Sequence, residues 1–128
     1  ALFMPRRGRG WAMQGEGRFE VRHTPLTVSM LEPVLLTLIQ QKAQHGYSLL
    51  SELEALDLGT IHPSVVYRTL RELENLDWIE STWDTNQTQG PPRRTYNLTD
   101  QGQNALLTWQ HELSKVQSVI KYLLDAQT

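Results

Sequence analysis

Four arginines in two short segments carry the clearest candidate chemistry of this sequence. Arg68 and Arg71 are three residues apart, so a helix would place both guanidinium groups on one face. Guanidinium groups bind guanine edges and phosphate oxygens through paired hydrogen bonds, and this face could therefore read DNA. Arg93 and Arg94 follow two prolines that stiffen a predicted turn, where basic side chains typically meet the sugar–phosphate backbone. Because neighbouring residues of a strand point to opposite faces, only one of this second pair should contact DNA well.

Each arginine pair also has a simpler explanation. Within a helix, Arg68 could bond with Glu72, four residues further on. Arg71 could likewise bond with Glu74 or Asn75. The second pair could belong to a solvated turn, although two adjacent arginines are unusual in a body of negative charge.

Two further polar residues lie beside the helical arginines. Ser64 shares their polar face, and we include it among the candidate DNA contacts. Tyr67 is next to this face and could donate its hydroxyl to a phosphate, but a tyrosine here equally often packs at the edge of a core.

Sequence motifs of enzymes are not evident. The histidines are scattered, without the four-residue spacing that lets a helix hold a metal ion: His23, His45, His62 and His111. The sequence has no cysteine, which excludes thiol catalysis, disulfides and thiolate zinc sites. No nucleophile elbow, phosphate-binding loop or dinucleotide glycine motif occurs. We therefore expect no enzymatic activity, no metal and no cofactor.

Charge is distributed unevenly along the chain. The 128 residues carry a net charge of −2, but residues 1–26 hold five arginines against two glutamates. The rest is net acidic, so an anionic partner must meet a local basic patch. Residues 1–25 are predicted to form a basic Arg- and Gly-rich arm, which could contact DNA, strap a dimer or be disordered. The longest strongly apolar stretch, residues 34–39, is far too short to cross a membrane, and we expect a cytoplasmic protein.

The elements that would position these residues begin with two helices. A first helix is predicted over residues 29–44, because Ser29 and Glu32 have the spacing of a capping box. Gly46 should then break the chain before a short second helix. Gly59 should end that helix, because glycine adopts the left-handed conformation easily.

A third helix, a hairpin and a fourth helix are predicted next. Pro63 can occupy the first turn of a helix over residues 62–77, which carries the arginines of the first pair. Aromatic and β-branched residues on both sides of a polar loop predict a β-hairpin whose wing spans residues 84–95. Thr99 or Asp100 can cap the final helix.

The final helix, residues 100–128, carries an apolar seam. Its members recur at intervals of three and four residues, as in a coiled coil: Leu106, Trp109, Leu113, Val116, Ile120 and Leu123. The helix could pack only on its own domain, but so long a seam favours an interface between two copies, and we predict a homodimer.

Three helices and a two-stranded wing predict a mainly α fold with a small β-hairpin. This is the winged helix-turn-helix domain, expected over residues 26–99, with a long C-terminal dimerisation helix after it. In this fold the third helix enters the major groove of double-stranded DNA.

Several segments in one order resemble the PadR-like transcriptional regulators. They are His45-Gly46-Tyr47, residues 66–74 (VYRTLRELE), residues 90–99 (GPPRRTYNLT) and Gly102. The resemblance covers roughly residues 30–102. Two departures are local: the family often has glycine where Ser64 stands, and its small members often place a pocket tryptophan at the position of Leu113.

The resemblance implies a homodimeric, DNA-binding repressor. The family includes sensors of phenolic acids and of drugs, and regulators without a known effector, among them a circadian period-extending protein of cyanobacteria. The alternative function is a dimeric small-molecule sensor or protein-interaction module that keeps the fold. Trp109 and Trp11 could then line a pocket for a small aromatic effector, although Trp109 is more simply explained as interface core.

Overall fold

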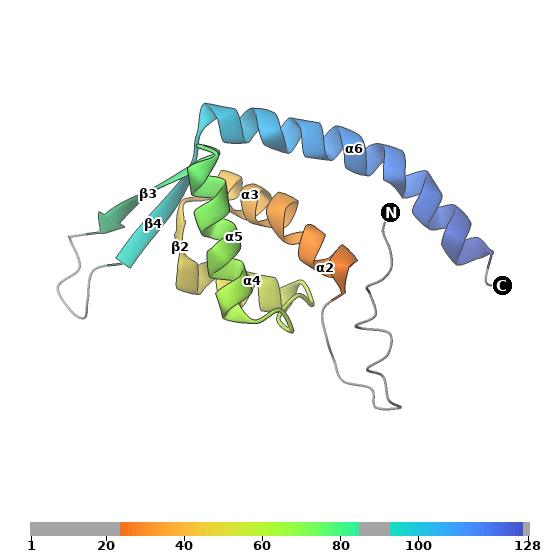
Figure 1. The fold of residues 1–128 in the computed structure, drawn as a ribbon, viewed down its shortest axis with the longest axis horizontal. Coiled ribbons are helices and arrows are strands. Elements are labelled where there is room, and N and C mark those ends of the chain that lie inside the picture. Colours follow the sequence, from red (N-terminus) through yellow and green to blue (C-terminus); the bar gives the residue numbers. More distant parts are fainter. Residues whose placement is uncertain (1–23, 85–92, 127–128) are drawn as a thin grey trace.

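A computed structural model of the protein describes residues 24–84 and 93–126. The elements, in chain order, are α2 (Pro25–Ser29), α3 (Leu31–Gln41), β2 (Gln44–His45), α4 (Gly46–Ala55), α5 (Pro63–Asn75), β3 (Ile79–Asp84), β4 (Arg93–Leu98) and α6 (Asp100–Asp125). Figure 1 shows α3, α4 and α5 together in the body, with β3 and β4 projecting on one side and α6 running along the body and past it on the other. The predicted fold class is confirmed.

The N-terminal region differs from the single helix predicted over residues 29–44. The chain forms two helices, and α2 begins earlier because Thr24 caps it: the Thr27 amide donates to Thr24 Oγ1 at 3.2 Å, and Pro25 fills the first turn. Ser29 forms no capping box, because its hydroxyl donates to the Pro25 carbonyl instead. The second helix, α3, ends at Gln41.

Gln44 belongs to a strand that the sequence did not predict. The short strand β2 pairs antiparallel with β4, giving a three-stranded sheet in the order β2-β4-β3. The Gln44 side chain is buried, and its Nε2 donates to the Leu38 carbonyl at the end of α3. A two-residue strand has no periodicity of its own, so only its tertiary partners define it.

Both glycine predictions for the second helix were wrong. Gly46 does not precede the helix but begins α4. The helix ends at Ala55, and the residue with left-handed backbone is Asp57, at φ 64°, rather than Gly59. Aspartate tolerates this conformation better than most residues.

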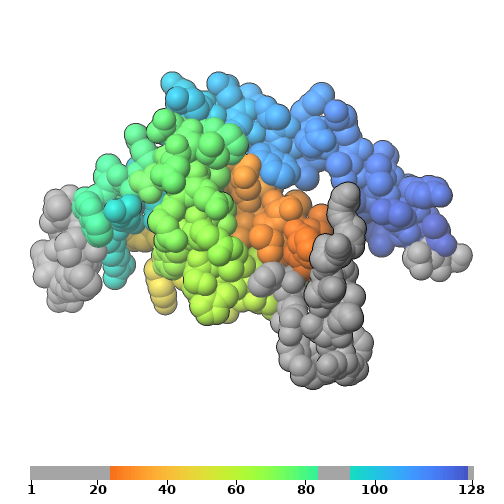
Figure 2. Space-filling view, viewed as in Figure 1, coloured from red at the N-terminus to blue at the C-terminus, as the bar shows by residue number. Residues whose placement is uncertain are grey.

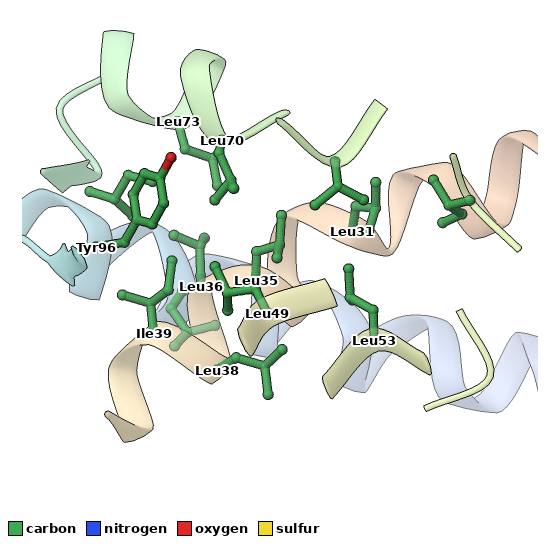
Figure 3. Packing of buried hydrophobic residues seen from close by; sticks show 14 residues of the cluster. Leu31, Leu35, Leu36, Leu38, Ile39, Leu49, Leu53, Leu70, Leu73 and Tyr96 are labelled. Carbon is green, nitrogen blue, oxygen red and sulfur yellow. The ribbon is translucent and has the colours of Figure 1, made fainter. Parts of the chain in front are cut away.

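The core lies between α3, α4, α5 and the base of the sheet. Figure 3 shows leucines of these three helices meeting there, with the ring of Tyr96 from β4 closing the side next to α5. Leu76, just after the end of α5, is about half exposed and lies outside this core.

The start of α6 is held against the turn that joins α5 to β3. Thr99 is the cap: its Oγ1 accepts from the Gly102 amide at 3.0 Å and donates to the Asp77 carbonyl at 2.5 Å. A Cβ at Gly102 would overlap the Trp78 carbonyl oxygen, so this close approach requires glycine. The wing and the long helix therefore start from one fixed point.

Candidate nucleic-acid interface

The helix α5 begins at a histidine cap. His62 Nδ1 accepts a hydrogen bond from the Ser64 amide at 3.0 Å and lies 2.8 Å from the Ser64 hydroxyl. Pro63 occupies the first turn, as predicted. Ser64 is exposed at the start of the predicted recognition helix, with its hydroxyl held by His62.

Arg68 and Arg71 are exposed on the polar face of α5. Among the described residues, neither makes an ion pair or a side-chain hydrogen bond, so the bonds to Glu72, Glu74 or Asn75 that the sequence allowed are not formed. Both guanidinium groups keep their donors for another partner.

Tyr67 is half-buried, so it could serve in either of the two predicted roles, packing at the edge of the core or contact with a phosphate. Its ring lies against Gly46: a Cβ at that glycine would come 2.7 Å from Tyr67 Cε1 and 3.1 Å from the hydroxyl oxygen. The side chain packs on the core and also borders a cavity at the surface. Tyr67 therefore packs at the edge of the core, and its contact with a phosphate stays a prediction.

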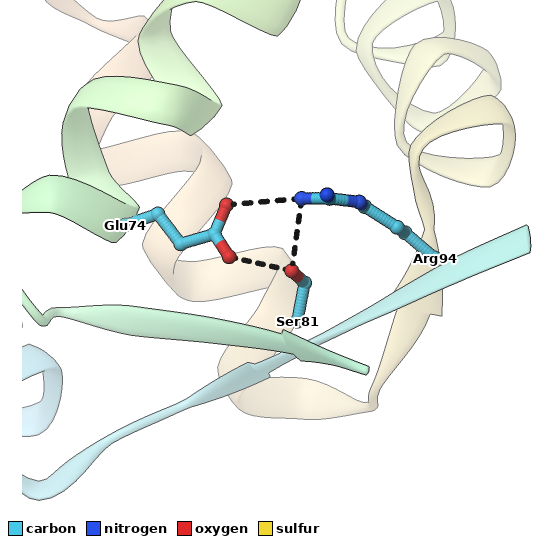
Figure 4. A network of polar contacts seen from close by, with 3 residues as sticks. All are labelled: Glu74, Ser81 and Arg94. Carbon is cyan, nitrogen blue, oxygen red and sulfur yellow. Dashed lines mark hydrogen bonds and ion pairs between the residues drawn. The ribbon is translucent and has the colours of Figure 1, made fainter. Parts of the chain in front are cut away.

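The two arginines of the wing have different surroundings. Arg94 lies directly across the sheet from Trp83, and its guanidinium carbon is 4.9 Å from the centre of the indole ring. Its Nη1 donates to Ser81 Oγ at 3.2 Å and is 3.6 Å from Glu74 Oε1 (Figure 4). Arg93 is exposed and makes no such contact with the described residues. The wing tip, residues 85–92, lies outside the described residues.

A cavity of about 780 Å³ separates the wing from α4 and α5. Its wall contains three arginines, Arg71, Arg93 and Arg94, and four aromatic side chains, Tyr47, Tyr67, Trp83 and Tyr96. None of the described residues that line it is acidic. This is the local basic patch that an acidic body needs in order to meet a polyanion.

Tyr96 joins this patch to the core. Burial raises the pKa of its phenol above the usual 10.0, and the nearby carboxylate of Glu74 raises it further. Tyr96 therefore stays neutral at physiological pH and contributes no charge to the patch.

The structure divides the predicted apolar seam of α6 into two parts. Leu106 is only 2% exposed, inside the core of its own domain, and Leu113 borders a hollow lined by α3 and α4. Val116, Ile120 and Leu123 are 38%, 48% and 56% exposed. Figure 2 shows this distal half of α6 standing away from the helical body.

Trp109 links α6 to α3. It packs against the core, and its indole Nε1 donates to Glu32 Oε2 at 2.6 Å. This contact supports a packing role within one protomer. Trp11, the other residue of the predicted effector pocket, lies outside the described residues, as do residues 1–23 of the arm predicted over residues 1–25. The last two residues of that predicted arm, Thr24 and Pro25, instead begin α2.

Three residues around Arg94 were not predicted from the sequence: Glu74 of α5, and Ser81 and Trp83 of β3. Glu74 was considered only as a partner for Arg71 on the same helix, whereas it faces the wing. Alternation along the strands could have placed Trp83 and Ser81 on the face of Arg94, because Trp83 and Arg94 are opposite in the hairpin.

The helices α3, α4 and α5 with the wing define a winged helix-turn-helix domain, and α6 extends it. The chain belongs to the transcriptional regulator PadR-like family, whose model matches residues 35–108. The expectation drawn from the sequence motifs is confirmed, and the family is one of transcriptional regulators. A search of proteins with curated functions found no match.

Solved structures agree with this assignment. A PadR-like transcriptional regulator from Bacillus cereus is 25% identical with a TM-score of 0.70, over 79% of this chain and 97% of that one. A transcriptional regulator from Streptococcus is 25% identical with a TM-score of 0.69, over 79% and 98% of the two chains. A PadR family regulator from Eggerthella lenta is 24% identical with a TM-score of 0.68, over 77% and 85%, and shows the shared fold.

None of the helices within residues 24–84 and 93–126 combines the length and apolar character that crossing a membrane requires. In the same two ranges, no three histidine, aspartate or glutamate side chains lie together in a way that could hold a metal ion.

Proposed function

We propose that the protein is a homodimeric, sequence-specific repressor that reads the major groove with α5. The observation that carries this proposal is the pair Arg68 and Arg71: both are exposed on one helix face, and neither is engaged by a described acidic side chain. Two-point hydrogen bonds from such arginines to guanine distinguish base pairs. Ser64 and Tyr67 at the same face would add contacts to the phosphate backbone.

The wing has the second role, in which Arg93 contacts phosphate. Arg93 is exposed at the edge of the basic cavity, whereas Arg94 is held by Glu74 and Ser81. A phosphate contact positions the protein on DNA without reading its sequence.

Dimerisation would join two reading helices. Exposed apolar side chains on the distal part of α6, among them Val116, Ile120 and Leu123, support an interface with a second copy. A dimer matches paired half-sites in DNA. The proposed output is repression in the cytoplasm, which is what the resemblance to the PadR-like regulators implies.

A ligand sensor is the second candidate. The cavity beside the wing is favourable to it, because about 780 Å³ and four aromatic side chains suit a small aromatic molecule. The basic wall of the same cavity also suits phosphate. Because the exposed arginines of α5 point to DNA as well, DNA binding is the first candidate.

Selection of genomic fragments by the full-length protein tests the proposed function. We expect recovery of fragments that share a pseudo-palindromic site, bound at least about a thousandfold more tightly than unrelated DNA at the same salt concentration. Retention of no DNA at low salt would instead favour the sensor or a protein-interaction module.

A further inference from the structure

Glu74 connects the recognition helix to the wing. It is the residue before the last of α5, and its two carboxylate oxygens have separate partners. Oε2 accepts a hydrogen bond from Ser81 Oγ of β3 at 2.5 Å, and Oε1 is 3.6 Å from Arg94 Nη1 of β4. Arg94 Nη1 in turn donates to Ser81 Oγ at 3.2 Å, which closes a triangle of three side chains from three elements (Figure 4).

Trp83 supports Arg94 within the wing. The guanidinium lies over the indole ring at 4.9 Å, an arrangement in which the aromatic face attracts the cation. Trp83 and Arg94 are cross-strand neighbours, so this contact is internal to the hairpin. The bonds to Glu74 and Ser81 then connect the hairpin to α5.

The position of Glu74 is unfavourable for DNA binding taken alone. It lines a hollow of about 510 Å³ together with Arg68, Arg71, Glu72, Asn75 and Arg94. A carboxylate among these arginines repels the DNA that the proposed function brings to them, and it reduces the positive potential there. Its bonds to Ser81 and Arg94 give it a different use, because they fix the wing relative to α5.

We propose that Glu74 and Arg94 are positioning residues that set the angle between the wing and α5, and thereby the sequence discrimination of the protein. The proposal rests on the proposed function. Specific binding requires base contacts from α5 and a phosphate contact from the wing at the same time, so it depends on their relative placement. Nonspecific binding depends mainly on charge and tolerates a loose wing.

The substitution Glu74→Gln tests the proposal, and Glu72→Gln is its matched control. Both substitutions remove one negative charge from the same helix, but the side chain of Glu72 makes no ion pair or hydrogen bond with the described residues. Dissociation constants are measured for the selected operator and for a shuffled duplex over a series of salt concentrations. For Glu74→Gln we expect operator affinity to fall about tenfold, the loss typical of one charge-assisted hydrogen bond, while affinity for the shuffled duplex stays equal or rises. For Glu72→Gln the ratio of the two affinities should not change.

Arg94→Ala and Ser81→Ala complete the experiment. If Arg94 acts through Glu74, its removal should lower the same ratio and leave the salt dependence of operator binding unchanged. If Arg94 instead holds a phosphate, the slope of log affinity against log salt should flatten by about 1.8 for a dimer, and the proposal is overturned. Ser81→Ala removes only a hydroxyl and should lower the ratio in the same direction, so it serves if Glu74→Gln does not fold.

Two results separate this proposal from the proposed function. A wild-type protein that binds operator and shuffled DNA equally would refute the function itself. A discriminating wild type whose ratio survives in Glu74→Gln and Ser81→Ala would refute only the positioning role.

Discussion

Shortening Ile120 tests whether a second copy covers the distal part of α6. The side chain is 48% exposed in the protomer, so about half of its surface is available for burial in a dimer. Complete burial of such a side chain is worth about 1.5–3 kcal/mol, and burial of the exposed half is worth about half of that. A symmetric interface contains this side chain twice, once from each copy, so the two contributions add. Ile120→Ala keeps one carbon of the side chain, so we expect dimerisation to weaken by about 1–3 kcal/mol, or roughly five- to 150-fold in dissociation constant.

Sedimentation over a range of protein concentrations measures this dissociation constant. Ser118→Ala is the matched control, because Ser118 is two residues from both Val116 and Ile120 and therefore lies on a different face of the helix. Leu113 is a poorer site for the test, since it borders the hollow between α3 and α4 and its loss would also affect the protomer. An unchanged dissociation constant for Ile120→Ala, or a wild type that stays monomeric at high concentration, would refute the reasoning.

Three further predictions concern the fold and the wing. Gly102→Ala should destabilise the protein by about 1–3 kcal/mol in urea denaturation, since the new Cβ meets the Trp78 carbonyl, whereas Gln101→Ala on the exposed side should have little effect. Because the pKa of Tyr96 is raised above 10.0 in the folded state, the unfolded chain releases this proton first, and the free energy of unfolding should fall as the pH rises above 10.0. Tyr96→Phe should make that fall smaller in denaturation curves recorded across this pH range, and an identical fall would contradict the assignment. Arg93→Ala should weaken operator and shuffled DNA alike and flatten the salt slope by about 1.8 for a dimer, and loss at one base position with an unchanged slope would place the wing in a groove.

Much of the fold could be predicted because its signals are local. Pro63 in a first turn, the composition of the two strands and the helical period of residues 100–125 are each read along the chain itself, and the helices and strands that they predict were confirmed. The errors have local causes too. Ser29 had a cap spacing by coincidence, while Thr24 with Pro25 provided the actual helix start. Glycine was taken as a break at Gly46, where its lack of a side chain instead lets α4 approach Tyr67.

The sequence predicted which residues form the candidate site, but it did not predict which side chains contact one another there. Arg68, Arg71 and Arg93 are exposed as expected. The ionic partner of Arg94 could not be predicted from the sequence, because Glu74 is twenty residues away and the contact exists only when the hairpin folds back on α5. The same reason hid the strand β2, whose two residues are defined by their pairing with Tyr96 and Thr95.

Operator binding by Arg68→Ala and Arg71→Ala at one fixed salt concentration tests the central claim most directly. We expect each variant, folded as the wild type by circular dichroism, to lose about 1–3 kcal/mol of operator affinity and to relax its preference at particular base pairs. Unchanged affinity and unchanged base preference in both variants would show that α5 does not read the DNA.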